Sequence, residues 1–489
     1  MRKLRTSILG MLLISISALA QDPIAVKYAN TITEDDMRAK LTVLASDEFG
    51  GRETGTEGQK KASKFLEDFY SKVGLAAPVD GSYRQKFKMY QSDWSDVYIK
   101  AKSGKKINGQ DFIFLGSANM NKEMKLETVF IGDASTIDEI DIKGKGVMTT
   151  ARGREVLGKI NEAGATAIFV VSGNDEQFMQ TLPRQARFRL KSRLRFDKEL
   201  SGEPTIIFNI TKAMAAELMN TSAENLSLET KPRNIRFMVK EKPIEIDTEN
   251  MMAYLEGTDL KDEVLVISSH YDHIGQNEDG TVINNGADDD GSGTTGVMEI
   301  AEALAQAAAD GHRPRRSILF LNVTGEEKGL LGSAYYADNP IFPIEKTVNN
   351  LNIDMIGRVD PEHEESGNRD YVYVIGSEKL SSHLKIISEY ANITYTGLDL
   401  DYRYDDPNDR NRFYYRSDHY NFAKSGIPII FYFNGTHPDY HRPTDTVDKI
   451  TFDVMAKRAQ LVFHTAWILV NRDERTPVDK KDDMDYTSR

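Results

Sequence analysis

The sequence predicts an α/β protein: a three-layer α/β/α sandwich around a mixed, mostly parallel sheet, with a smaller β-rich domain inserted into it. From about residue 245 onward, short apolar runs of strand length recur, and helical patterns lie between several of them. Strands that alternate with helices form largely parallel sheets covered on both faces. Residues 106–244 do not show this regular alternation, which predicts a separate inserted module.

The first twenty residues are typical of a secretory signal peptide. Arg2, Lys3 and Arg5 precede an apolar run that ends in Ala18-Leu19-Ala20, a cleavage pattern of the A-x-A type. The run is shorter than the roughly 20 apolar residues that a spanning helix needs. We therefore expect an exported protein, periplasmic or secreted, with no membrane span after signal removal.

Composition and charge exclude several classes of function. The 489 residues carry a net charge of −13, and loss of the three signal-peptide cations gives −13 − 3 = −16. An acidic chain is a poor partner for nucleic acid, because phosphate binding needs a positive field. The chain has no cysteine, so disulfides, thiolate nucleophiles and zinc–sulfur ligation are excluded. The length suits two or three domains, and the oligomeric state stays open.

The predicted elements follow in order. Apolar residues at helical spacing predict a helix over 56–74, within an N-terminal part of the main domain over 21–105. In the inserted module, basic and apolar residues alternate over 187–196, which predicts a charged edge strand. The main part, 245–472, precedes a charged tail over 473–489. Its expected strands are 264–269, 317–323, 348–354, 371–375 and 427–433.

The segment NNGADDDGSGTTG, residues 284–296, contains three adjacent carboxylates among glycines. A solvated turn is one interpretation, because Asn, Asp and Gly are common turn formers. A calcium loop starting at Asp288 is another, although the sequence just upstream has no helical pattern, as an EF-hand requires. The third is a transition-metal site with partners elsewhere in the chain.

Those partners follow the predicted strands. Ligands bind an open α/β sheet at the carboxyl ends of its strands. The side chains that follow the strands here are His270 and Asp272, Glu326 and Glu327, Asp354, and His441. Asp354 ends an apolar strand, and a buried lone carboxylate is costly unless it is paired or metal bound.

Two histidines and several acids suit zinc, and a pair of zinc ions needs one bridging carboxylate. We assign the bridge to Asp288, because its small neighbours let the backbone come close, and expect Asp289 to shape the loop from outside the ligand set. One of Glu326 and Glu327 would bind metal while the other takes a proton from water. Asp272 would accept the second N–H of His270.

These motifs resemble the co-catalytic two-zinc exopeptidases of peptidase family M28, which include secreted bacterial aminopeptidases. The matching stretches are SSHYDHIG, NNGADDDGSGTTGVMEIA, TGEEKGLLGS, NIDMIG, YRSDHYNFAKSGIP and HPDYHRPTDT. The inserted module resembles a protease-associated (PA) domain through DIKGKGVMTTARG and INEAGATAIFVV.

The resemblance implies a full set of ligands for two zinc ions per chain. The implied ligands are His270, Asp288 and Asp354 for one ion, and Asp288, Glu327 and His441 for the other. It also implies Glu326 as general base and Tyr440 as the donor that stabilises the oxyanion. The reaction would be hydrolysis of N-terminal residues of peptides by a hydroxide held between the ions. A glutaminyl-cyclase-like or carboxypeptidase-type activity on the same fold, or a binding role for the inserted module, remains the alternative.

Overall fold

The computed structural model describes residues 21–135, 137–191, 193–199 and 204–481, which form two compact units. Unit 1 contains the chain up to Lys86 and from Thr248 onward, and unit 2 contains Phe87–Asp247. The expected signal peptide and residues 482–489 of the tail lie outside the described residues. Unit 2 begins at 87 rather than 106, because β2 (Tyr98–Ala101) pairs with β9 (Arg233–Met238) in its sheet.

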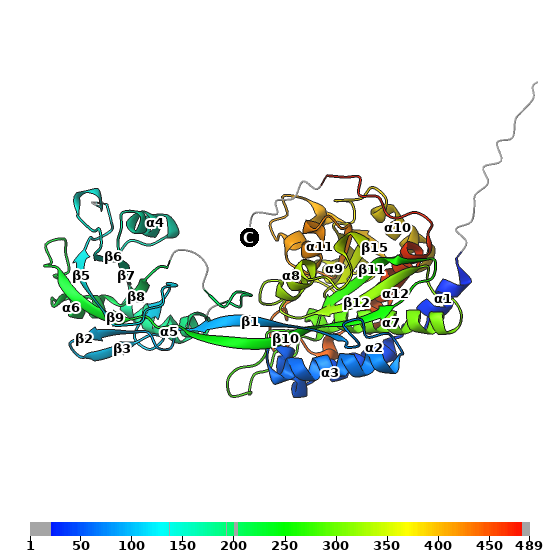
Figure 1. Ribbon diagram of the computed structural model, residues 1–489, viewed down its shortest axis with the longest axis horizontal. Coiled ribbons are helices and arrows are strands. Elements are labelled where there is room, and N and C mark those ends of the chain that lie inside the picture. Colours follow the sequence, from blue (N-terminus) through cyan, green and yellow to red (C-terminus); the bar gives the residue numbers. More distant parts are fainter. Residues whose placement is uncertain (1–20, 136, 192, 200–203, 482–489) are drawn as a thin grey trace, which may run out of the picture. The chain divides into compact units, whose positions relative to one another are not determined.

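Unit 1 is built on an eight-stranded sheet with the order β1-β10-β12-β11-β13-β16-β14-β15. Figure 1 labels β1, β10, β12, β11 and β15 of this sheet. Its strands are β1 (Arg84–Asp93), β10 (Lys242–Leu255), β11 (Leu260–His270), β12 (Arg316–Val323), β13 (Thr347–Ile353), β14 (Tyr371–Ile375), β15 (Asp399–Asp401) and β16 (Ile429–Phe433). The four central strands β12, β11, β13 and β16 run parallel, whereas β10 and β14 are antiparallel to β12 and β16. The mixed, mostly parallel sheet is confirmed.

Helices cover both faces of this sheet. One apolar core joins the sheet to α1 (Pro23–Ala29), α2 (Glu34–Leu44), α3 (Glu57–Lys72), α7 (Gly293–Ala309), α10 (Leu384–Ala391) and α12 (Phe452–Asn471). A second core joins its other face to α8 (Leu331–Asp338) and α11 (His419–Lys424). Short α9 (Pro361–Ser366) lies between β13 and β14 in the chain. Three layers result, as predicted.

The expected helix over 56–74 is α3. Thr56 caps its first turn by accepting a hydrogen bond from the Gln59 N–H, and the helix buries Ala62, Leu66 and Tyr70 on one face. None of the helices in the described part of the chain combines the length and apolar character needed to cross a bilayer.

Unit 2 has its own eight-stranded sheet, in the order β3-β2-β9-β5-β6-β7-β8-β4. Its other strands are β3 (Gly104–Ile107), β4 (Ile113–Phe114), β5 (Met124–Phe130), β6 (Gly146–Thr149), β7 (Ala167–Val171) and β8 (Ile207–Ile210), and its helices are α4 (Arg154–Glu162), α5 (Asp175–Arg189) and α6 (Lys212–Met219). The strand predicted over 187–196 is wrong at its start. Residues up to Arg189 belong to α5, whose first turn is capped by Asn174.

Candidate metal centre

Four segments bring ionisable side chains to one edge of the unit 1 sheet. Because β11, β12, β13 and β16 are parallel, their carboxyl ends share that edge. His270 is the last residue of β11, Glu326 and Glu327 follow β12, and Asp354 follows β13 directly. The loop after β16 carries His441.

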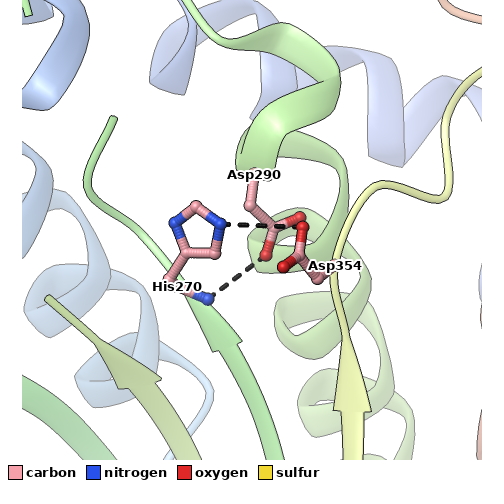
Figure 2. Close-up of side chains that lie close together, drawn as sticks. All are labelled: His270, Asp290 and Asp354. Atoms are coloured by element: carbon pink, nitrogen blue, oxygen red, sulfur yellow. Dashed lines mark hydrogen bonds and ion pairs between the residues drawn. The ribbon is translucent and has the colours of Figure 1, made fainter. Parts of the chain in front are cut away.

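A first group of donors surrounds the His270 ring. Its Nε2 lies 3.3 Å from Asp289 Oδ1 and 3.6 Å from Asp354 Oδ1 (Figure 2 shows the second pair). Its Nδ1 lies 3.0 Å from the backbone oxygen of Asp272, which fixes the ring with Nε2 facing the two acids. The Asp272 carboxylate, predicted as this partner, is farther away at 3.7 Å. It instead accepts hydrogen bonds from the Thr54 hydroxyl and the Glu326 N–H.

A second group of donors surrounds the His441 ring. Its Nε2 lies 3.0 Å from Asp289 Oδ2 and 3.1 Å from Glu327 Oε2. The two oxygens of Asp289 therefore face two different histidines, one from the end of β11 and one from the loop after β16. This is the arrangement expected of a carboxylate that bridges two cations.

The predicted bridging residue, Asp288, does not lie beside these two histidines; its neighbour Asp289 does. Asp288 Oδ1 accepts hydrogen bonds from the Gly357 N–H and the Ser292 hydroxyl, and Oδ2 lies 3.2 Å from His437 Nε2. Asp288 is thus paired with His437, whereas Asp289 lies between His270 and His441. The loop holds this orientation because the Asp445 carboxylate accepts hydrogen bonds from the backbone N–H groups of both Asp288 and Asp289.

Asp290 has a third, separate environment. Its carboxylate accepts hydrogen bonds from the backbone N–H groups of His270, Gly293 and Met355, at 3.2, 2.8 and 3.0 Å. Figure 2 shows it beside Asp354, at the start of α7. Asp290 therefore ties together the end of β11, the beginning of α7 and the turn after β13. Three adjacent carboxylates are neither a solvated turn nor one calcium loop, since all three are buried and each has different partners.

The loop needs glycine at two points of close approach. A Cβ on Gly286 would lie 2.2 Å from the Asp289 backbone oxygen, and one on Gly293 would lie 2.3 Å from Asp290 Oδ1. Both approaches are too short for any other residue. The small neighbours of the aspartates are thus required by the fold of the loop itself.

The charges of this cluster fit a cationic occupant. Burial pushes the pKa of Asp289 upward, but His270 and His441 outweigh burial and hold it well below its usual range. Burial lowers the pKa of His441, yet Asp289 and Glu327 raise it to about 10. Burial raises the pKa of Glu326 well above its usual range, and the nearby Glu327 and Asp354 add to this. Buried carboxylates in such excess require a compensating positive charge.

Unpaired donor atoms support the same occupant. Within the described residues, Asp289 Oδ2 and Glu327 Oε1 are buried and receive no hydrogen bond, although imidazole nitrogens lie about 3 Å away. Donor atoms that converge without being aligned for hydrogen bonding suit a shared metal ion. Imidazole nitrogens and carboxylate oxygens are ligands that zinc accepts.

Residues 250–466 match the model of peptidase family M28. The predicted resemblance to this family is confirmed over that part of the chain. It is 22% identical over 496 aligned positions to Aminopeptidase YwaD of Bacillus subtilis (strain 168), covering 96% of this chain and 94% of that protein. It is 30% identical over 218 positions to a probable leucine aminopeptidase of Trichophyton verrucosum, covering 42% of this chain and 54% of the relative.

Solved structures share the fold of this chain. The aminopeptidase from Aneurinibacillus sp. strain AM-1 superposes with a TM-score of 0.56 at 19% identity, covering 94% of this chain and 99% of that one. The zinc aminopeptidase BSAP from Bacillus subtilis gives a TM-score of 0.52 at 18% identity, covering 93% and 99%. Both alignments extend over unit 1 and unit 2.

A cavity opens on the candidate metal ligands. Its polar wall contains Asp289, Glu326, Asp354 and Tyr440, and the rest of its lining is Met355, Phe413, Arg416, Phe431, Phe433 and Thr436. Arg416 Nη2 donates a hydrogen bond of 3.2 Å to the Tyr440 hydroxyl. Burial, with the nearby Asp289 and Glu327, raises the pKa of Tyr440, so its hydroxyl keeps its proton at neutral pH.

Sequence reasoning missed three residues around the centre. His273 lies beside Glu327, His437 faces Asp288, and Asp445 holds the aspartate loop. His273 and His437 stand inside the quoted motifs SSHYDHIG and HPDYHRPTDT, where an imidazole next to a predicted ligand is a usable signal. Asp445 gives no such signal, because an acid in a polar loop is common.

Proposed function

We propose that this chain is a secreted zinc metallo-exopeptidase, an aminopeptidase that removes N-terminal residues from peptides and holds two zinc ions. The observation that carries the proposal is the position of Asp289, whose two oxygens face His270 and His441 separately. One ion would be held by His270, Asp289 and Asp354. The other would be held by Asp289, Glu327 and His441.

The separations between donor atoms suit these ligand sets. A tetrahedral zinc ion with bonds of roughly 2.1 Å places its ligands about 3.4 Å apart. The pairs made by His270 Nε2 with Asp289 and Asp354 are 3.3 and 3.6 Å apart. Those made by His441 Nε2 with Asp289 and Glu327 are 3.0 and 3.1 Å apart.

The chain supplies the remaining parts of a hydrolytic mechanism. When bound, the zinc ions polarise the scissile carbonyl and acidify water. Glu326, in the cavity wall, accepts the proton of the attacking water and returns it to the leaving amine; its raised pKa helps it to hold that proton. Asp272 positions Glu326 by accepting a hydrogen bond from its backbone N–H. Tyr440 donates a hydrogen bond from its hydroxyl to the developing oxyanion.

The character of the cavity supports an aminopeptidase. Its ionisable wall contains three carboxylates, which attract the α-ammonium group of a free N-terminus. Arg416 is the observation that favours the second candidate, a carboxypeptidase, because a guanidinium in the lining suits a substrate carboxylate. Peptides blocked at one end or the other, assayed with and without a chelator and then with zinc restored, separate the two activities.

The base is tested by Glu326→Gln. The variant should bind two zinc ions, since Glu326 is not among the proposed ligands, while kcat falls by about 10²- to 10⁴-fold. Glu365→Gln is the matched control, because Glu365 is exposed on α9, and it should keep full activity. A folded Glu326→Gln enzyme with the activity of the control would contradict the assigned base.

Two further parts of the proposal concern the whole chain. Export rests on the predicted signal peptide, and fractionation of cells that express the full chain tests it. The protease-associated character of unit 2 rests on its motifs and on the parallel core β5-β6-β7-β8.

A further inference from the structure

His273 is a buried imidazole that the proposed ligand sets leave unused. It follows His270 by three residues and is 0% exposed. Within the described residues, neither of its ring nitrogens has a hydrogen-bond partner. A buried imidazole ordinarily keeps at least one hydrogen bond, since leaving a buried polar atom unpaired is energetically costly.

Other buried histidines of unit 1 show the contrast. His363 Nδ1 lies 2.8 Å from Asp360 Oδ1, and His419 Nε2 lies 2.8 Å from the Tyr414 backbone oxygen. Each of these two rings keeps one hydrogen bond to the protein, whereas both nitrogens of His437, which faces Asp288, lack one among the described residues, as those of His273 do. The His273 ring is held by packing instead, because a Cβ on Gly286 would lie 2.6 Å from it, and its backbone N–H bonds to the Arg52 carbonyl.

The free nitrogen of His273 faces the second group of donors. Nδ1 lies 2.8 Å from Glu327 Oε1 and 3.8 Å from Asp289 Oδ2. The ring centres of His273 and His441 are 5.7 Å apart, and their planes are inclined at 69°. Two imidazole nitrogens thus approach the same two carboxylates from different directions, with separations close to the roughly 3.4 Å between ligands of a tetrahedral zinc ion.

We propose that His273 is a fourth protein ligand, through Nδ1, for the metal position formed by Asp289, Glu327 and His441. The inference rests on the two-metal centre proposed above. It makes the two positions unequal. One position has a single imidazole and two carboxylates as protein ligands. The other has two imidazoles and two carboxylates, which is a full set of four ligands. The position with two imidazoles therefore fills first and retains its metal longer.

Cobalt binding tests this, because the visible spectrum of Co²⁺ reports its coordination independently of activity. Metal-free wild-type protein titrated with CoCl₂ should bind two equivalents in two steps. His273→Asn should lower the cobalt affinity of the tighter step by about tenfold to a hundredfold and change the spectrum of the bound ion. His441→Asn should weaken the same step, and His270→Asn the other.

A second variant separates ligation from packing. His273→Phe fills the space against Gly286 but offers no nitrogen, so it should show the same weakened step with wild-type circular dichroism. If a folded His273→Asn or His273→Phe variant bound cobalt in two steps with wild-type affinity and spectrum, the inference would be overturned. The proposed two-metal centre would not be affected. A wild-type protein that binds cobalt as described but cleaves no peptide would instead contradict the proposed function alone. No cobalt binding at all would overturn both.

Discussion

Units 1 and 2 have the same kind of framework but different side chains at the ends of their strands. Each contains an eight-stranded sheet with four adjacent parallel strands. In unit 1 His270 ends one of the parallel strands, and Glu326 and Asp354 follow two others. In the described part of unit 2 the buried polar residues are all uncharged: Ser92, Asn108, Thr128, Thr149, Ser172 and Thr211.

The histidines are divided in the same way. All nine of them lie in the segments that form unit 1, and none lies between residues 87 and 247. A parallel sheet alone therefore does not produce a metal centre; the residue types at its carboxyl edge do. The buried charges of unit 1 are the part of the molecule that a bound cation must stabilise.

The largest expected effect comes from replacing one of the two neighbouring aspartates, Asp289, in the loop before α7. Asp289→Asn removes the carboxylate that faces both histidines, so metal content should fall below two per chain. Peptide cleavage should decrease at least about a thousandfold, because metal supplies several kcal/mol of transition-state stabilisation. Elemental analysis of dialysed protein and kcat/KM measure both.

Asp288→Asn is the matched control. Its amide oxygen can still accept the hydrogen bonds of Gly357 and Ser292, and only the charge opposite His437 is lost. Two metal ions should remain, and activity should fall by at most about a hundredfold, the usual size for a partner outside the ligand set. If Asp288→Asn lost the metals and Asp289→Asn kept them, the bridge would return to Asp288.

A smaller effect is expected at the oxyanion donor. Arg416 donates to the Tyr440 hydroxyl oxygen and cannot accept, so the hydroxyl proton is free to point into the cavity. Tyr440→Phe should lower kcat by about 10²- to 10³-fold with KM and metal content little changed. Arg416→Met should lower kcat by no more than about tenfold, the value of one hydrogen bond. Equal losses in KM and kcat for Tyr440→Phe would point to substrate binding instead.

Much of the fold could be predicted from the sequence because the parallel strands are buried on both faces. Their apolar runs appear in the sequence as uninterrupted blocks, and β11, β12, β13, β14 and β16 all fall where expected. The alternation over 187–196 was misleading, because its first residues, up to Arg189, belong to α5, where residues two apart in the sequence do not share a face. Local periodicity in a polar segment cannot decide between helix and strand without its packing partner.

The site could be predicted as a set of segments but not as a set of orientations. His270, Glu327, Asp354 and His441 converge as expected, because strand ends determine their positions. The choice between Asp288 and Asp289 depends on the path of the loop, which Asp445 holds from more than 150 residues away. No pattern within the loop contains that contact. His273 was missed because its neighbour His270 already filled the expected role.

The smallest expected effect concerns the pH dependence of unit 1, which holds all the histidines. His464 on α12 is buried, and its ring stacks on Tyr395 with 3.8 Å between ring centres. Burial lowers its pKa from 6.5 to about 4. The unfolded chain therefore binds this proton first as the pH falls. The stability contributed by neutral His464 is complete above pH 6.5 and is lost as the pH falls from about 6.5 to about 4, by up to about 3 kcal/mol.

His464→Phe keeps an aromatic ring against Tyr395 and removes the titration. Urea unfolding of both proteins over pH 4 to 8 should give a difference in the free energy of unfolding that is constant above pH 7. Below pH 6.5 the difference should shift progressively in favour of the variant. Other histidines titrate equally in both proteins and cancel in this difference. A difference that stays flat down to pH 4 would mean that His464 is hydrated in the folded protein, and the acid sensitivity of unit 1 would then have to come from the metal centre.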